Sequence, residues 1–123
     1  MSSRPQFDPF PVITDGDMST TLISLPTVIN KLSMFSYDIS WTGAPVGDFS
    51  VEVSNTYKQN ADGTVRTVGN WTPLPLSGMP TATGTSGTGF IDIEAIGAYA
   101  MRLVFTPTSG SGTMNAVASG KVS

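Results

Sequence analysis

The strongest constraint on the fold of this chain is an alternation of apolar and polar residues with a period of two. Near the end of the chain four large side chains share one parity and two polar ones the other: Tyr99, Met101, Leu103 and Phe105 against Arg102 and Thr106. Successive side chains of a strand point to opposite faces, so the pattern predicts a half-buried antiparallel strand. The Gly- and Ser-rich turn at 107–112 and the small residues at 113–122 predict a β-hairpin that ends the chain.

Two earlier segments repeat the alternation. In the first, 34–42, the apolar parity holds Phe35, Tyr37, Ile39 and Trp41, and the polar parity holds Ser36, Asp38 and Ser40. In the second, 49–57, the two sets are Phe49, Val51, Val53 and Tyr57 against Ser50, Glu52 and Ser54. The short Gly- and Pro-containing loop at 43–47 between them predicts a second β-hairpin.

Shorter strand-like pieces and turns fill the rest of the chain. Asn60–Gly63 is a turn signal, since Asn, Asp and Gly tolerate positive φ. The segment 77–89 has almost nothing to bury and is expected to be a long flexible loop, and one helical turn is expected near 94–97. About seven or eight strands at near-regular spacing predict an all-β fold, a single antiparallel β-sandwich. Jelly-roll-like and immunoglobulin-like strand orders both remain open, because pairing depends on long-range contacts.

The first eleven residues contain Pro5, Pro9 and Pro11, each of which fixes φ and removes an amide donor. We therefore expect residues 1–11 to form an extended N-terminal arm and residues 12–123 to form the sandwich. The arm carries two aromatic anchors, Phe7 and Phe10, as candidate partner-binding residues. A frayed terminus is the alternative.

Composition excludes several classes of partner. Charged residues make up only 12% of the 123 residues, against about 25% in typical domains. The net charge is −3 and the six basic residues are scattered, so no nucleic-acid partner is expected. No stretch has the length of a membrane helix or the layout of a signal peptide, so neither membrane anchoring nor secretion by a standard signal is expected. A low-charge, hydroxyl-rich surface is cheap to desolvate and suits a larger assembly.

Few residues of this chain are suited to catalysis or to metal binding. The chain has no His and no Cys, which removes the usual nucleophilic triads and thiolate or imidazole metal sites. Asp92 and Glu94 share a strand face, but they point the same way rather than across a groove, and a solvated face explains them. The turns at 15–17 and 60–63 offer oxygen ligands without the spacing of a calcium loop. We expect no enzymatic activity, cofactor or metal.

Aromatic residues offer a possible sugar platform. Trp41, Tyr57 and Tyr99 lie on the apolar parity of their strands, so core packing explains them better. Trp71, beside Pro73, is the aromatic residue most expected to be exposed, and it is the third candidate partner-binding residue.

Several short blocks in order carry a resemblance to known proteins. These are WTG and FSVEVSN within Trp41–Asn55, NWTPLPL at Asn70–Leu76, FIDI from Phe90, and YAMRLVFTPTSGSGTMNAVASGK from Tyr99. Together they resemble small β-sandwich virion proteins of tailed bacteriophages. The likeness covers about residues 34–123. It implies a capsid decoration or cement protein on the exterior of the virion, a homo-oligomer such as a trimer, with the major capsid protein as its partner.

A second function stays open. A glycan-binding or host-adhesion module of a phage fibre, vertex or neck would use Trp71 with the loops at 43–47 and 77–89. An enzyme resting on Asp38, Asp92 or Glu94 is the third and weakest interpretation.

Overall fold

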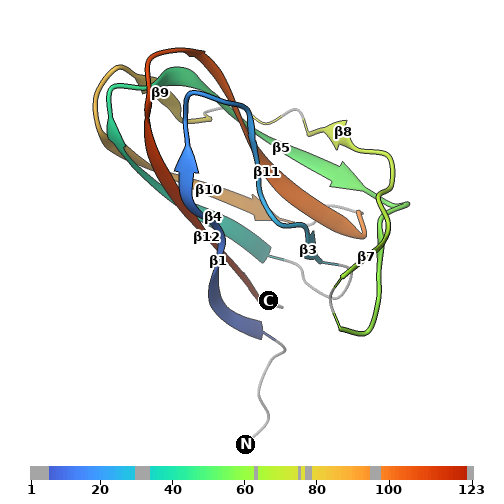
Figure 1. Ribbon diagram of the computed structural model, residues 1–123. Coiled ribbons are helices and arrows are strands. Elements are labelled where there is room, and N and C mark those ends of the chain that lie inside the picture. The colour runs from blue at the N-terminus through green and yellow to red at the C-terminus, as the bar shows by residue number, and fades with distance from the viewer. Residues whose placement is uncertain are drawn as a thin grey trace, which may run out of the picture.

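The computed structural model describes residues 6–29, 34–62, 64–74, 76, 79–94 and 98–121, and within these ranges every regular element is a β-strand (Figure 1). The strands are β1 (Gln6–Asp17), β2 (Leu22–Ile23), β3 (Thr27–Val28), β4 (Met34–Gly43), β5 (Val46–Ser54), β6 (Lys58–Gln59), β7 (Val65–Thr67), β8 (Thr72–Pro73), β9 (Thr81–Thr83), β10 (Gly87–Glu94), β11 (Ala100–Ser109) and β12 (Gly112–Lys121). The predicted all-β class is confirmed, with more strands than expected because several short pieces share an edge. No helix long and apolar enough to cross a membrane is found in this described part of the chain.

Two antiparallel sheets face each other. Sheet A has the order β1-β12-β4-β10. Sheet B has the order β2-β11-β5-β8, with β3 also beside β11 and β9 also beside β5. The small hairpin of β6 and β7 stands apart from both sheets. The sandwich predicted from the alternation is therefore what the chain forms.

The strand pairs are nested. β1 pairs with β12, β2 and β3 with β11, β4 with β10, and β5 with β8 and β9. The nested pairs fold over together, so that β4 also pairs with β12 and β5 also pairs with β11. This is the strand order of a jelly roll, which resolves the choice that the sequence leaves open.

Both predicted hairpins are wrong. β4 pairs with β10 and β12, and β5 pairs with β8, β9 and β11, so β4 and β5 lie in opposite sheets. β11 and β12 are divided between the sheets in the same way. The alternation shows only which side chains face the core. It is the same whether two consecutive strands pair as a hairpin or lie in opposite sheets, so it does not determine the pairing. The two crossing connections stack, because the Ala44 amide donates to the Ser111 carbonyl at 2.9 Å.

The core lies between the inner faces of the sheets and follows the predicted parity. Met101, Leu103 and Phe105 are fully buried, and the inward residues of 35–41 and of Phe49–Val51 are buried with them. The rings of Trp41 and Phe105 both pack against Phe49 in tilted arrangements, with centroids 5.2 and 4.9 Å away. Tyr99 is only half-buried, because β11 begins one residue later and Tyr99 lies outside the core cluster.

The expected boundary between arm and sandwich falls inside β1. This strand starts at Gln6 and pairs with β12, with register shifts between Phe7 and Phe10 and on either side of Ile13. It forms one edge of sheet A, where prolines are tolerated because an edge strand needs hydrogen bonds on one side only. Residues 1–5 of the predicted arm lie outside the described residues.

The long loop expected at 77–89 is also wrong in part. Thr81–Thr83 forms β9 beside β5, Ala82 is buried, and β10 begins at Gly87. One inward alanine in three residues is too weak a pattern to be recognised as a strand. The helical turn expected at 94–97 falls on the end of β10 at Glu94 and otherwise outside the described residues.

Candidate functional site

Trp71 lies immediately before β8 and is half-buried. Its indole Nε1–H donates to the carbonyl oxygen of Val68 at 2.8 Å. Its ring also packs against Tyr57, with the ring centroids 5.7 Å apart. The indole is therefore held in one orientation by the chain around it rather than left free.

Arg102 covers the ring of Trp71. Its Cζ atom lies 4.3 Å from the indole centroid, within the range of a cation–π contact. The guanidinium also donates a hydrogen bond from Nε to Oε1 of Glu52 at 2.8 Å, and its Nη2 forms an ion pair with the same oxygen at 2.7 Å. Arg102 and Glu52 are directly opposite in the pairing of β11 with β5, so the strand register sets up the ion pair. Both side chains are about one-fifth exposed.

Exposed aliphatic side chains surround this stack. Ile23 on β2, Val65 on β7 and Val68 are 54%, 52% and 69% exposed. Together with Trp71 and Arg102 they line a hollow of about 170 Å³ over sheet B, and we call these five residues the sheet B patch. Large hydrophobic side chains gathered at one place on a small domain mark interaction surfaces more often than scattered ones do.

The β6–β7 hairpin that carries Val65 is fastened to the sandwich. Ser54 Oγ accepts hydrogen bonds from the amides of Thr56 and Tyr57, at 3.1 and 3.0 Å. Tyr57 is 2% exposed, and this burial raises the pKa of its hydroxyl, with a further increase from nearby Tyr99. Lys58 Nζ lies 5.0 Å from the centroid of the Tyr99 ring. The patch is therefore assembled by fixed contacts before any partner arrives.

The two acidic turns considered for calcium use their oxygens locally. Asp62 Oδ1 accepts from the amide and hydroxyl of Thr64, and Asp17 Oδ1 accepts in the same way from Ser19. These hydrogen bonds lower the pKa of both carboxyl groups. Among the described residues no group of three or more acidic side chains gathers as a metal site would require.

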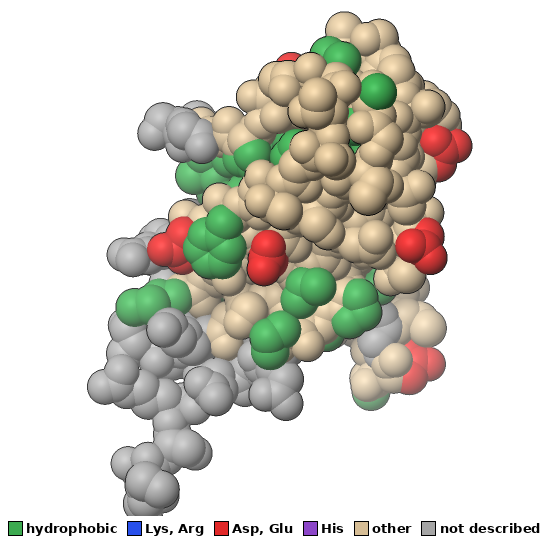
Figure 2. Space-filling model, turned by 90° about the vertical axis from the view of Figure 1, so that its left-hand side faces the viewer, with side chains coloured by type: hydrophobic (Ala, Val, Ile, Leu, Met, Phe, Trp, Pro, Cys, Tyr) green, Lys and Arg blue, Asp and Glu red, His purple; other side chains and the backbone are tan. Residues whose placement is uncertain are grey.

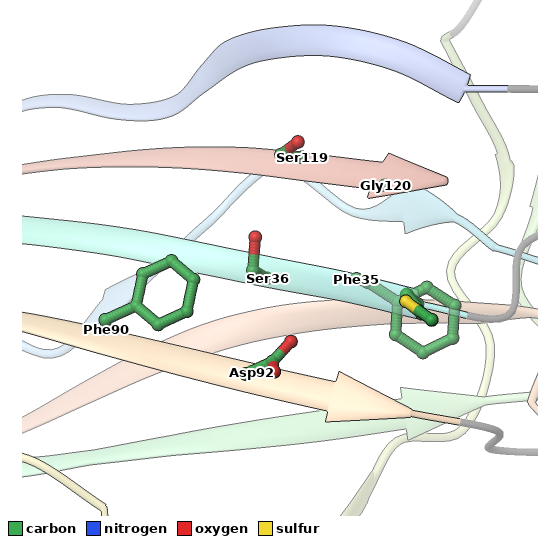
Figure 3. A pocket seen from close by; sticks show the side chains of 7 residues that line it. Phe35, Ser36, Phe90, Asp92, Ser119 and Gly120 are labelled. Atoms are coloured by element: carbon green, nitrogen blue, oxygen red, sulfur yellow. The ribbon is translucent and has the colours of Figure 1, made fainter. Parts of the chain in front are cut away.

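A second surface lies on the outer face of sheet A. Asp92, Ser36 and Ser119 are register partners on β10, β4 and β12, and they form a row across three strands (Figure 3). Phe90, two residues from Asp92, stands beside the row and is 63% exposed. Together with Met34, Phe35 and Gly120 these residues line a shallow hollow of about 300 Å³.

The described side chains on this side of the molecule include acidic ones but no basic ones. The view in Figure 2 shows acidic and hydrophobic side chains among polar ones, and no Lys or Arg side chain of the described residues is visible in it. The described side chains of the four strands of sheet A likewise include no Lys or Arg.

The structure places the three predicted partner-binding residues apart. Phe10 lies on β1 and packs against the core, and Phe7 pairs through its backbone with Gly120. The side chain of Phe7 lies outside the described residues. Trp71 is on the other sheet, next to the Thr72 that pairs with Val53 at the end of β5.

The groups proposed for a glycan site are not all brought together. The loops at 43–47 and 83–87 do meet, since the Gly84 amide donates to the Pro45 carbonyl at 2.7 Å. They lie at the start of β5, where Val46 pairs with Thr83, and Trp71 lies at its other end. The acidic residues are also not paired across a groove, because Asp38 is opposite Phe90 and Asp92 is opposite Ser36.

Sequence reasoning missed Phe90, Arg102 and Glu52 as surface residues of interest. A signal for Phe90 was present, because it shares the parity of Asp92 while Ile91 and Ile93 occupy the buried parity. No local pattern joins Arg102 to Glu52 and Trp71, since only the strand pairing brings them together.

A scan against models of known protein families finds none that matches this chain, and a search of curated proteins finds no significant match.

Proposed function

We propose that this protein is a structural virion protein that decorates the exterior of a bacteriophage capsid and binds the major capsid protein through the sheet B patch. The resemblance of the sequence to small virion proteins supplies the class of partner. The observation that carries the surface is the stack of Arg102 on Trp71, ringed by the exposed side chains of Ile23, Val65 and Val68.

The composition of this patch is that of a protein interface. Energetic hot spots are rich in Trp, Tyr and Arg, and a ring of less critical contacts excludes water around them. Here the indole is fixed by Val68 and Tyr57, and the guanidinium is fixed by Glu52. Little conformational entropy is then lost on docking, which favours affinity.

A low-charge domain also suits repeated attachment. With 12% charged residues, few ions must be desolvated when the surface is covered. Many weak contacts on a symmetric shell add up to stable occupancy when the decorating units are linked as oligomers.

Self-association has an available edge in sheet A. β10 ends that sheet within the described residues, and its pairing with β4 runs without a register shift from Gly87 to Glu94. It contains no proline, whereas β1 at the other edge contains Pro9 and Pro11. An open, regular edge strand is a template for another chain, and a second copy can extend it.

Co-sedimentation with undecorated shells tests the proposed surface. Wild-type protein is expected to pellet with shells at saturable stoichiometry, and Val68→Ser is expected to weaken binding by about tenfold through loss of apolar contact. Val117→Ser, on the outer face of sheet A, is the matched control and is expected to bind as wild type does. Equal binding by all three proteins would exclude the sheet B patch as the docking surface.

A further inference from the structure

We propose that the hollow on the outer face of sheet A binds a neutral saccharide. The site consists of the Phe90 ring and the row formed by Asp92, Ser36 and Ser119. It lies on the sheet opposite the sheet B patch, and it does not depend on capsid attachment.

The row offers hydrogen-bonding groups that no other described residue uses. Asp92, Ser36 and Ser119 sit on three adjacent strands as direct register partners. Neighbouring strands are about 4.8 Å apart, so the row spans roughly 10 Å, a length comparable to two sugar rings. None of the three side chains hydrogen-bonds to another residue in the described part of the chain. A ligand can therefore meet all of them without breaking an existing contact.

Phe90 adds an apolar surface at the edge of this row. Its side chain is 63% exposed, on the same face as Asp92 and directly opposite Asp38 in the strand register. An aromatic ring next to hydroxyl and carboxylate groups matches a pyranose, which has one C–H face and hydroxyls around its rim.

The charges of the surface select the kind of sugar. Asp38 and Asp92 are both exposed on this face, so two carboxylates meet an incoming ligand. Sialylated, sulfated or phosphorylated glycans are therefore repelled. A hydroxyl donor to the Asp92 carboxylate is favoured, since hydrogen bonds to ionised acceptors are the stronger ones.

An apolar partner fits the hollow less well than a sugar does. Phe90 is 63% exposed at one side of the hollow and Met34 is partly buried at the other, while the row of Asp92, Ser36 and Ser119 between them is polar. A lipid or an apolar peptide segment would bury Asp92 and both hydroxyls without giving them partners, which is costly.

The test is an NMR titration of isotope-labelled protein with neutral oligosaccharides built from glucose, galactose, mannose or N-acetylglucosamine. At least one is expected to shift the backbone amides of Ser36, Phe90, Asp92 and Ser119, with a Kd on the order of 1 mM, as suits a shallow site. A panel in which no saccharide moves these amides would overturn the proposal. So would tighter binding of sialylated oligosaccharides than of neutral ones.

Variants separate this site from the sheet B patch. Phe90→Ala and Asp92→Asn are expected to raise the Kd about tenfold, and Phe90→Trp, which enlarges the ring, is expected to retain binding. Asp48→Asn, which removes an exposed carboxylate on β5, and Val68→Ser are controls with an unchanged Kd. Equal saccharide affinity in Phe90→Ala and wild type contradicts the site. Shell binding is expected to survive Phe90→Ala, so failure here and failure of the capsid role can be told apart.

Discussion

The guanidinium of Arg102 lies over the indole of Trp71 with Cζ 4.3 Å from the ring centroid, while its Nε donates a hydrogen bond to Oε1 of Glu52 and its Nη2 forms an ion pair with the same oxygen. One side chain thus joins β11, β5 and the segment before β8. This contact ties the exposed hydrophobic residues of the sheet B patch to the jelly roll.

Replacing Arg102 by Lys tests this contact. The ammonium keeps the charge but loses the planar stacking and the paired donors, so the free energy of unfolding is expected to fall by about 1 kcal/mol. Urea denaturation measures the change. Arg66→Lys on β7, where the arginine is exposed, is the matched control and is expected to change stability by less than about 0.5 kcal/mol. Equal losses in both variants would show that the stack contributes no stability.

Two glycines in connections between the sheets are expected to differ in how much stability is lost when each is replaced by alanine. Gly110 and Gly84 both have positive φ, 76° and 95°. A methyl group at Gly110 would overlap the carbonyl oxygen of Ala44, whereas the nearest atom at Gly84 would be 3.8 Å away on Val46. Gly84→Ala is expected to cost about 1 kcal/mol from backbone strain alone. Gly110→Ala is expected to cost about 2 kcal/mol more from overpacking.

Thermal or urea unfolding of the two glycine variants decides this prediction. If both lose the same stability, the connections at 43–46 and 109–112 are not packed as tightly as the Ala44–Ser111 hydrogen bond indicates.

The buried hydroxyl of Tyr37 predicts a loss of stability at high pH. Burial raises the pKa of this group well above its usual range, and the nearby hydroxyls of Ser24 and Thr27 offset only part of the effect. In the unfolded chain the Tyr37 hydroxyl loses its proton near pH 10, whereas in the folded protein it stays protonated. Above that pH the folded state therefore binds more protons than the unfolded state does. Stability is therefore full below about pH 10 and falls above it, by up to about 1.4 kcal/mol per pH unit.

Tyr37→Phe separates this contribution from others. Urea unfolding between about pH 8 and 11 is expected to show a shallower decline for the variant than for wild type. Near pH 8 the two proteins should differ little, because the Tyr37 oxygen is buried without a hydrogen bond to any described group. Parallel curves across the range would contradict the assignment.

Two N-terminal deletions distinguish the contribution of residues 1–5 from that of the edge strand β1. Because β1 begins at Gln6, a protein that lacks residues 1–5 is expected to keep the unfolding midpoint of the full chain. Removal of residues 1–11 also deletes half of β1 and would damage the sheet. Unchanged shell binding after removal of residues 1–5 would show that these residues do not clasp a neighbour.

Much of the fold follows from parity along single strands. The alternation in 35–41 and 101–105 correctly identifies buried side chains, because a sandwich strand needs one apolar face whatever its neighbours are. The pairing could not be deduced in that way. β4 meets β12 and β5 meets β11 across long stretches of sequence, and nothing local distinguishes a hairpin from a crossing connection.

The candidate surfaces were harder to predict than the core. Trp71 could be identified as a surface aromatic from its place among prolines, but its contact with Arg102 depends on the register of β11 and β5. Phe90 was not singled out, because the face of its strand that carries Asp92 was expected to be polar and solvated. Its parity with Asp92 nevertheless indicates that it is exposed.

The most direct test of the capsid role is the copy number of this protein in purified, intact particles, measured by quantitative mass spectrometry against the major capsid protein. We expect copies in a fixed proportion to the shell lattice, and we expect particles that carry Val68→Ser to lose most of them while Val117→Ser particles keep them. Absence of the protein from intact particles, or a handful of copies per particle, would contradict a decoration protein.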